Sequence, residues 1–216
     1  MDKIRILIAD DHKILRESLV NYLSQKDRIE VVGEASNGHE ALKDALSLAP
    51  DVVILDISLP LLNGLDVAAR LKDEAPGIKV IILTMHKNED FVKRAFQSGV
   101  AAYLLKENAL EELLKAIETV TDGGIYISTK ISSIVVSGFL HNANDPGKVS
   151  VEPVSPRERE ILQLLAEGHS NKDIAAILHL SLKTIETHRF NLMHKLGLHS
   201  ITDLVLYAVR NHIIEV

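Results

Sequence analysis

The sequence predicts an α/β domain with a parallel sheet, followed by a small all-α domain of four helices. Short apolar runs rich in Val and Ile alternate five times with helical patterns over residues 3–121, whereas residues 155–209 carry helical patterns alone. Strands that alternate with helices form parallel sheets with right-handed crossovers, and the helices cover both faces of the sheet. A chain of 216 residues has room for two modest domains of this kind.

The five strand-helix units follow from hydrophobic spacing. The clearest strand is Val52–Leu55, a run of four apolar residues that indicates burial on both faces. The first expected helix, 12–23, has apolar residues near helical spacing, and Gly99 and Gly123 follow the last two expected helices. We expect strands at 3–9, 29–35, 52–56, 80–84 and 102–105, and helices at 12–23, 38–48, 63–72, 89–97 and 110–121.

The second domain is predicted to begin shortly before a helix start signal. Ser155 can cap a helix, Pro156 suits its first position, and Glu158 completes a capping box. Ser181 is the expected cap of a later helix, which Gly197 ends. The helices are expected at 156–166, 171–178, 182–196 and 200–209. The first domain is assigned to 1–122, a linker to 123–152, in which 130–140 permits a short helix, and the second domain to 153–216.

Composition excludes several classes of protein. The chain has no cysteine, which excludes disulfides, Cys-zinc sites and thiol catalysis. No apolar run approaches the ~18 residues of a membrane span, and the N-terminus leads into a strand pattern in place of a signal peptide. We therefore expect a cytoplasmic protein without a membrane partner.

Polar residues follow four of the predicted strands. Asp10 and Asp11 follow the first, Asp56 the third, Thr84 the fourth and Lys106 the fifth. In an open parallel sheet, ligands bind beyond the carboxyl ends of the strands, so these side chains should converge. Crowded carboxylates repel one another unless a cation lies among them, and Mg²⁺ prefers such oxygen ligands. The pattern predicts a magnesium site with Asp11 and Asp56 as ligands and Asp10 acting through water.

The same set predicts phosphoryl chemistry. With the metal and Lys106 neutralising phosphoryl oxygens, the Asp56 carboxylate can attack in line and form an aspartyl phosphate. Thr84 offers a hydroxyl to the new oxygens, and Tyr103 would swing inward once Thr84 is drawn toward them. Taken singly, each residue has an ordinary role as turn, solvated or core residue. Their occurrence as a set, in this order, favours the functional interpretation.

These residues carry a resemblance to a known family. Residues 1–122 resemble the receiver domain of two-component response regulators, in Asp10-Asp11, in the stretch from Asp56 to Pro60 with Gly64, in Thr84 and in 103–106. Residues 153–214 resemble a LuxR-type helix-turn-helix, so the chain is similar to NarL/FixJ-type regulators. The resemblance implies a flavodoxin-like, five-stranded parallel sheet of order 2-1-3-4-5. It also implies phosphorylation of Asp56 by a sensor histidine kinase, and Mg²⁺ on Asp10, Asp11, Asp56 and the backbone carbonyl of Ser58.

The sequence departs from the receiver pattern at some positions. Leu59 stands where such receivers usually have Met, a swap that conserves volume. Glu107 stands where the wider family often has a cis proline after the lysine. Ser58 and His86 occupy the two positions that tune phosphate lifetime in the family.

The second domain is expected to bind promoter DNA. A tight turn at 179–181 joins a scaffold helix to a recognition helix whose N-terminal part would enter the major groove. Ile185, Leu192 and Leu196 fall near one face and should be core. The DNA-contacting candidates, most of them turned partly outward by this arrangement, are Lys183, Thr184, Glu186, Thr187, Arg189, Phe190 and Lys195.

Different roles are expected within this set. Lys183 and Lys195 would neutralise phosphates, whereas Glu186, Thr187 and Phe190 are candidates for base edges. Arg189 could instead form a structural pair with His188.

Charge favours a dimer on DNA. From residue 151 on, seven Lys and Arg face eight Asp and Glu, so one such domain should bind DNA weakly. Two tethered copies would bind more tightly, and a homodimer formed on phosphorylation is therefore expected. RNA polymerase is a further possible partner.

Other functional classes remain open at this point. An aspartate-nucleophile phosphatase also places Asp after a buried strand, but usually carries a second Asp two residues on, where this chain has Ser58. A ligand-sensing regulator, or an unphosphorylated receiver used for dimerisation, is a third class. We expect no turnover enzyme, because a receiver loses its phosphate slowly.

Overall fold

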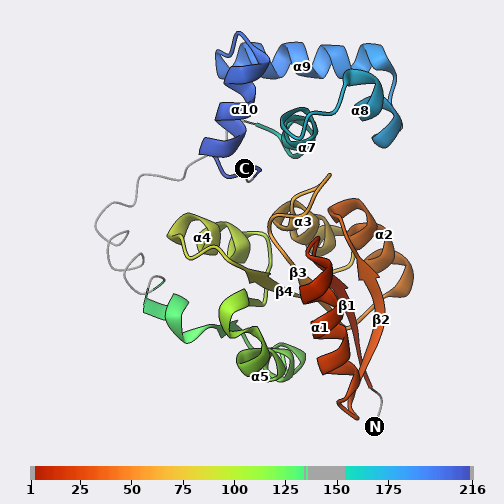
Figure 1. The fold of residues 1–216 in the computed structure, drawn as a ribbon, viewed down its shortest axis with the longest axis vertical. Coiled ribbons are helices and arrows are strands. Elements are labelled where there is room, and N and C mark those ends of the chain that lie inside the picture. The colour runs from red at the N-terminus through yellow and green to blue at the C-terminus, as the bar shows by residue number, and fades with distance from the viewer. Residues whose placement is uncertain (1–2, 134, 136–153, 215–216) are drawn as a thin grey trace. The chain divides into compact units, whose positions relative to one another are not determined.

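The computed structural model describes residues 3–133, 135 and 154–214. The chain divides into two compact units, which are described separately (Figure 1). Among the described residues, no helix combines the length and hydropathy needed to cross a bilayer.

The first unit contains a parallel sheet. Its strands are β1 (Ile4–Ala9), β2 (Ile29–Ala35), β3 (Val52–Leu55), β4 (Lys79–Thr84), β5 (Ala102–Leu105) and β6 (Tyr126–Ile127). Their order across the sheet is β2-β1-β3-β4-β5-β6, and every neighbouring pair is parallel. The predicted order 2-1-3-4-5 is confirmed for the first five strands.

The sixth strand corrects the five-stranded prediction. β6 pairs with β5 through Ala102–Tyr126 and Tyr103–Ile127, so the sheet continues past residue 122 into the segment expected as linker. A strand of two residues has no hydrophobic run to mark it in the sequence. Residues 129–133 are helical, and the predicted helix at 130–140 lies outside the described residues beyond position 135.

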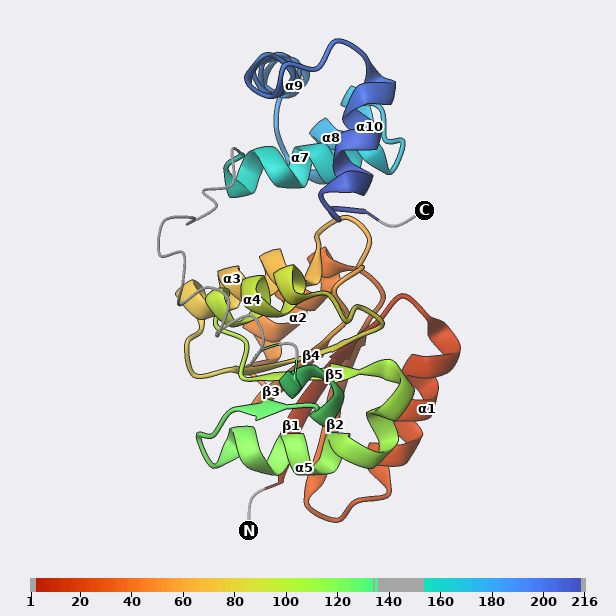
Figure 2. The same cartoon turned by 90° about the vertical axis from the view of Figure 1, so that its left-hand side faces the viewer.

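Helices cover both faces of this sheet (Figure 2). One face packs against α1 and α5, and the other carries α2, α3 and α4. The crossovers are those of a doubly wound sheet, which brings the strand ends to one edge. The helices are α1 (Lys13–Ser24), α2 (Gly38–Leu48), α3 (Gly64–Glu74), α4 (Glu89–Gln97) and α5 (Ala109–Thr121), with the 3₁₀ turn η1 (Lys106–Asn108) before α5.

The core explains why the central strands are uniformly apolar. All four residues of β3 are buried, because helices cover the sheet on both sides. Ile6, Ile8 and Ile54 face the side of α1 and α5, where they pack with Leu19 of α1 and other buried residues.

The second unit consists of helices within residues 154–214: α7 (Pro156–Ala166), α8 (Asn171–Ile177), α9 (Leu182–Leu196) and α10 (Ile201–Arg210). Ser155 and Glu158 form the predicted capping box, and Ser181 caps α9. Gly197 ends α9 in the left-handed conformation, at φ 64°. Ser170 and Ser200 cap α8 and α10 as well.

The core of the second unit is apolar apart from a few polar side chains. It includes Ile161 and Leu165 of α7, Ile174 of α8 and Leu204 of α10. Glu160 of α7 is not part of this apolar cluster, and its Oε2 accepts a hydrogen bond from Arg157 Nη1 at 2.6 Å.

Candidate functional site

The carboxyl ends of four strands place the predicted polar residues together. Asp10 follows β1 and Asp56 follows β3, and the backbone N–H of Asp56 donates to the carbonyl of Ala9 at 2.9 Å. Thr84 ends β4 and Lys106 follows β5, which lie next in the sheet. Asp10, Asp56 and Thr84 are all buried, so the sheet holds polar groups in a mostly apolar surrounding.

Lys106 joins two of the carboxylates. Its Nζ lies 2.7 Å from Asp56 Oδ2 and 2.8 Å from Asp10 Oδ2, and its side chain is only 7% exposed. A buried carboxylate needs such a partner, because an unpaired buried charge is costly. This triad is the convergence that the sequence predicted.

The pKa values of Asp56 and Lys106 are both raised, although burial and pairing act in opposite directions on each group. Burial raises the pKa of the Asp56 carboxyl, and the charge of Lys106 only partly offsets it. Burial would by itself lower the pKa of Lys106, but the charges of Asp56 and Asp10 outweigh it and raise that pKa. The ammonium group therefore stays charged near neutral pH.

The acidic cluster has the composition of a cation site. One ligand atom each from Asp10, Asp11, His12 and Asp56 lies within 4.8 Å of the others. Mg²⁺ is commonly bound by a few carboxylates and several waters. Asp11 is exposed, so water can reach the cluster at this residue. The backbone carbonyl of Ser58 stays a predicted ligand.

Gly64 allows the chain to pass close to Asp56. A Cβ at this position would lie 1.9 Å from the backbone oxygen of Asp56. The Gly64 N–H also donates to the carbonyl of Ile57 at 2.8 Å. The start of α3 therefore fixes the turn that presents Asp56, which only glycine permits without a backbone shift.

The turn after β4 is held by four contacts on His86. The backbone N–H of His86 donates to Thr84 Oγ1 at 3.3 Å, and its carbonyl accepts from the Tyr103 hydroxyl at 3.0 Å. Its ring Nε2 lies 3.2 Å from Ser58 Oγ, and the ring stacks on Phe91 with centroids 4.1 Å apart. The two positions predicted to tune phosphate lifetime therefore touch each other.

Tyr103 already occupies the inward position that the sequence predicted for the switched state. It is fully buried, and burial raises its pKa further above the ordinary tyrosine value. Its hydroxyl reaches the turn between β4 and α4, so the side chain links the site to that turn.

Sequence reasoning missed two residues that support the site. His12 Nδ1 lies 2.8 Å from Asp11 Oδ1 and 3.2 Å from Asp10 Oδ1. Arg16 Nη1 donates to the backbone carbonyl of Asp10, and Arg16 Nε lies 3.3 Å from Glu34 Oε2. His12 adjoins the acidic pair and Arg16 lies one helical turn further on, so their spacing was the available signal.

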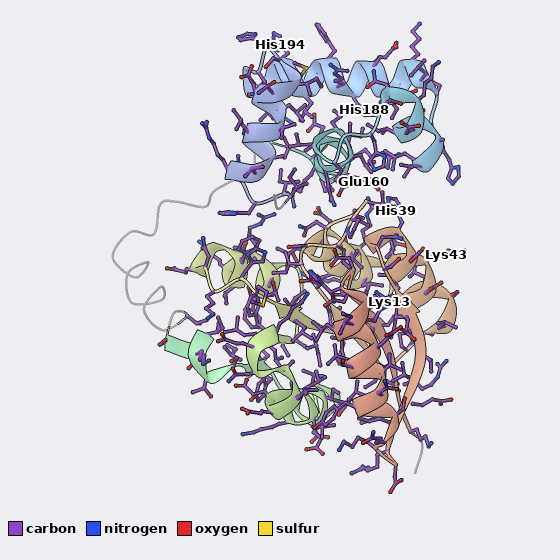
Figure 3. The ribbon with its side chains drawn as sticks, in the orientation of Figure 1. Lys13, His39, Lys43, Glu160, His188 and His194 are labelled. Carbon is purple, nitrogen blue, oxygen red and sulfur yellow. The ribbon has the colours of Figure 1, made fainter. Side chains whose placement is uncertain are left out.

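The second candidate site lies on α8 and α9. Ile185 and Leu192 are fully buried and Leu196 is half-buried, as the core prediction requires. His188 lies on the side of α9 toward α7, whereas His194 projects on the opposite side (Figure 3). Of the candidate DNA contacts, Thr184 and Arg189 are half-buried and the others are exposed.

These candidates differ in how they are engaged. Lys183 and Glu186 are exposed, and Phe190 is 70% exposed. Thr184 Oγ1 lies 2.7 Å from the capping Ser181 hydroxyl, and Thr187 Oγ1 donates to the carbonyl of Lys183 at 2.9 Å. The two threonines therefore also serve the helix itself.

The remaining two candidates have partners on other helices of this unit. Arg189 Nη1 lies 3.4 Å from Asn171 Oδ1, which ties α9 to the start of α8. Lys195 Nζ lies 2.8 Å from Oε2 of Glu158 on α7. The hydrogen bond from Lys195 is the main reason why the pKa of Glu158 falls to about 2.

Two protein families match this chain. Residues 6–118 match the response regulator receiver domain, and residues 152–208 match the bacterial regulatory proteins of the luxR family. The oxygen regulatory protein NreC of Staphylococcus aureus is 37% identical over 216 residues, covering 98% of this chain and 100% of that protein.

Solved structures of response regulators are similar to this chain. A structure of the response regulator RcsB from Salmonella typhimurium covers 96% of this chain and 98% of its own, with a TM-score of 0.60 and 27% identity. A structure of two RcsB dimers bound to two parallel DNAs covers 95% of this chain and 98% of its own, with a TM-score of 0.59 and 27% identity. The matches extend over both units.

Proposed function

Because this chain belongs to the two-component response regulators with a receiver domain and a LuxR-family DNA-binding domain, we propose that phosphorylation of Asp56 controls its binding to promoter DNA. A sensor histidine kinase is the proposed donor of the phosphoryl group. The observation that carries the proposal is the pairing of Lys106, whose side chain is only 7% exposed, with Asp56 and Asp10, beside the exposed Asp11.

The acidic residues and Lys106 have different proposed roles in phosphoryl transfer. Asp56 is the nucleophile, and one of its carboxylate oxygens bonds to phosphorus as the bond to the donor breaks. Lys106 orients that carboxylate and then neutralises phosphoryl oxygens. Asp10, Asp11 and Asp56 would hold Mg²⁺, with the carbonyl of Ser58, and the cation supplies further charge neutralisation when bound.

We propose that the turn after β4 changes conformation when Asp56 is phosphorylated. The Thr84 hydroxyl, which accepts the N–H of His86, would turn to the new phosphoryl oxygens. The hydrogen bond from Tyr103 to the carbonyl of His86 then holds the altered turn. A charge change at Asp56 thereby becomes a change of surface at the start of α4.

The output is proposed to be DNA binding by a homodimer. The RcsB structure with two dimers on two DNAs supports this stoichiometry. The near-neutral charge of the second domain is consistent with it, because paired domains gain affinity through effective concentration. Lys183 is the proposed phosphate contact, and Glu186 and Phe190 are the proposed base contacts.

Mass spectrometry tests the phosphoacceptor. The full chain is incubated with Mg²⁺ and a small phosphodonor such as acetyl phosphate, and should gain the mass of one phosphoryl group. Asp56→Ala should gain none, whereas Asp73→Ala, which removes an exposed carboxylate from the end of α3, should behave as the unmodified sequence does. Equal labelling of the Asp56 variant would refute the assignment.

We also propose that the chain loses its phosphate slowly and is not a turnover enzyme. Ser58 stands where an aspartate-nucleophile phosphatase would carry its acid/base, and its hydroxyl contacts His86. Steady hydrolysis of p-nitrophenyl phosphate that is lost in Asp56→Ala would favour the phosphatase. Equal DNA binding before and after labelling would favour a receiver used only for dimerisation.

A further inference from the structure

Glu107, which directly follows Lys106, bridges two lysines from distant parts of the first unit. Its Oε2 lies 3.1 Å from Lys87 Nζ, in the turn between β4 and α4. Its Oε1 lies 2.7 Å from Lys130 Nζ, in the helical residues after β6. Lys130 Nζ also lies 3.2 Å from Asn108 Oδ1. One carboxylate therefore connects three segments of the chain.

The electrostatics of Glu107 favour this bridge. The hydrogen bond from Lys130, followed by that from Lys87, lowers the pKa of Glu107, so the group is ionised at neutral pH. The Glu107 side chain is 34% exposed, and each lysine is 53% exposed. Exposed pairs are individually weak, so this bridge can open and close without disrupting the fold.

The segment from β6 to Ile131, which includes Lys130, is also tied to the interior of the first unit. The backbone N–H of Ser128 donates to the carbonyl of Tyr103 at 3.0 Å. Glu112 of α5 accepts from the Ser128 and Tyr126 hydroxyls, each at 3.3 Å. Ile131 is fully buried. Residues 126–131 are thus held by Tyr103 on one side and by Glu107 on the other.

We propose that Glu107 is a positioning residue that couples the state of Lys106 to the start of the linker. The proposal rests on the proposed phosphorylation of Asp56. Lys106, Glu107 and Asn108 form the single turn η1, so a shift of Lys106 toward phosphoryl oxygens moves the neighbouring carboxylate. The carboxylate then no longer holds Lys87 and Lys130 in the same geometry, and residues 128–133 are released at the point where the linker begins.

Hydrogen exchange measured by mass spectrometry on the full chain tests this coupling. Beryllofluoride with Mg²⁺ serves as the probe for the phosphorylated state. In the unmodified sequence, adding the probe should speed exchange of the amides of residues 128–133 about threefold, the scale of a lost exposed ion pair. In Glu107→Gln, these amides should exchange about threefold faster before the probe is added, and the probe should have no further effect.

Matched variants separate the bridge from general charge effects. Glu111→Gln removes the same charge from an exposed position on α5 for which no ion pair is found in the described part of the chain, and should keep the response to the probe. Lys130→Met should reproduce the effect of Glu107→Gln, and the double variant should add nothing to either single change.

The outcomes distinguish the coupling from the proposed function. If the probe alters exchange around residues 84–88 but leaves residues 128–133 unchanged, the coupling is wrong and the phosphorylation site stands. If Glu107→Gln responds to the probe as the unmodified sequence does, the coupling is likewise refuted. If neither the probe nor acetyl phosphate reacts at Asp56, the proposed function itself fails.

Discussion

Lys106 Nζ and Asp56 Oδ2 lie 2.7 Å apart, and Asp10 shares the same ammonium group. The site therefore contains more carboxylate charge than the lysine can neutralise. Because Asp10 and Asp56 are buried, this excess of negative charge is costly until a cation binds beside the carboxylates.

The raised pKa of Asp56 predicts a dependence of stability on pH. Burial raises the pKa in the folded state above the unfolded value of about 4, so between the two values the native protein binds more protons than the unfolded chain. Stability should therefore fall as pH rises through this window, by about 1.4 kcal/mol for each unit of the shift. Urea unfolding of Asp56→Asn should show less of this fall and a more stable protein at pH 8.

The effect of Mg²⁺ on stability provides a second test of the raised pKa of Asp56. The cation should raise the stability of the unmodified sequence at pH 8 and have a smaller effect on Asp56→Asn, because a ligand stabilises only a fold that binds it. Asp73→Asn should behave as the unmodified sequence does. An Asp56→Asn protein less stable than its parent at pH 8 would contradict the sign of the pKa shift.

Gly64→Ala should destabilise the first unit. The new Cβ would meet the backbone oxygen of Asp56 at 1.9 Å, which forces a backbone shift costing about 3 kcal/mol. Gly77→Ala is the matched control, because a Cβ there meets nothing within 4 Å. Thermal and urea unfolding measure both variants, and similar losses for the two would show that the close approach is relaxed in solution.

Glu158→Gln should weaken the second unit with a defined pH dependence. The hydrogen bond from Lys195 lowers the pKa of Glu158 to about 2, so its stabilisation is present above the unfolded value of about 4.3 and is lost as pH falls toward 2. With screening by solvent, we expect a loss of about 1 kcal/mol at pH 7. The difference from the unmodified sequence should vanish near pH 2, whereas Glu186→Gln should change little at either pH.

The same ion pair predicts unequal roles for two lysines on DNA. Exposed Lys183 should contact a phosphate, so Lys183→Met should reduce the salt slope of binding to a non-specific duplex by about 1. Lys195→Met should reduce it less, because Glu158 already pairs with this ammonium group. Fluorescence anisotropy over a series of salt concentrations measures both slopes, and equal reductions would show that DNA displaces Glu158.

Local patterns explain what the sequence could predict. The strands from β1 to β5 and the helix starts at Ser155 and Ser181 each depend on residues within a few positions, so spacing and capping rules identify them. Asp10, Asp56 and Lys106 could be placed together because a parallel sheet brings strand ends to one edge.

Contacts between residues that are distant in the sequence explain the features that the sequence could not predict. β6 is formed by pairing with β5 and not by its own two residues. The contact between Ser58 and His86, and that between Lys195 and Glu158, join residues 28 and 37 positions apart. No local rule selects such partners, so the turn around His86 and the engagement of Lys195 emerge only from the folded structure.

The pairing of β6 with β5 bears on how the receiver can be prepared alone. A fragment cut at residue 122 would lack Tyr126 and Ile127. It would leave β5 as an edge strand, with the backbone of Ala102 and Tyr103 unpaired on that side. Exposed edge strands of this kind pair with strands of other molecules, which leads to aggregation. An isolated receiver should therefore be more soluble when the cut is made beyond Ile131, because such a fragment keeps β6 on the edge of β5 and the buried side chain of Ile131.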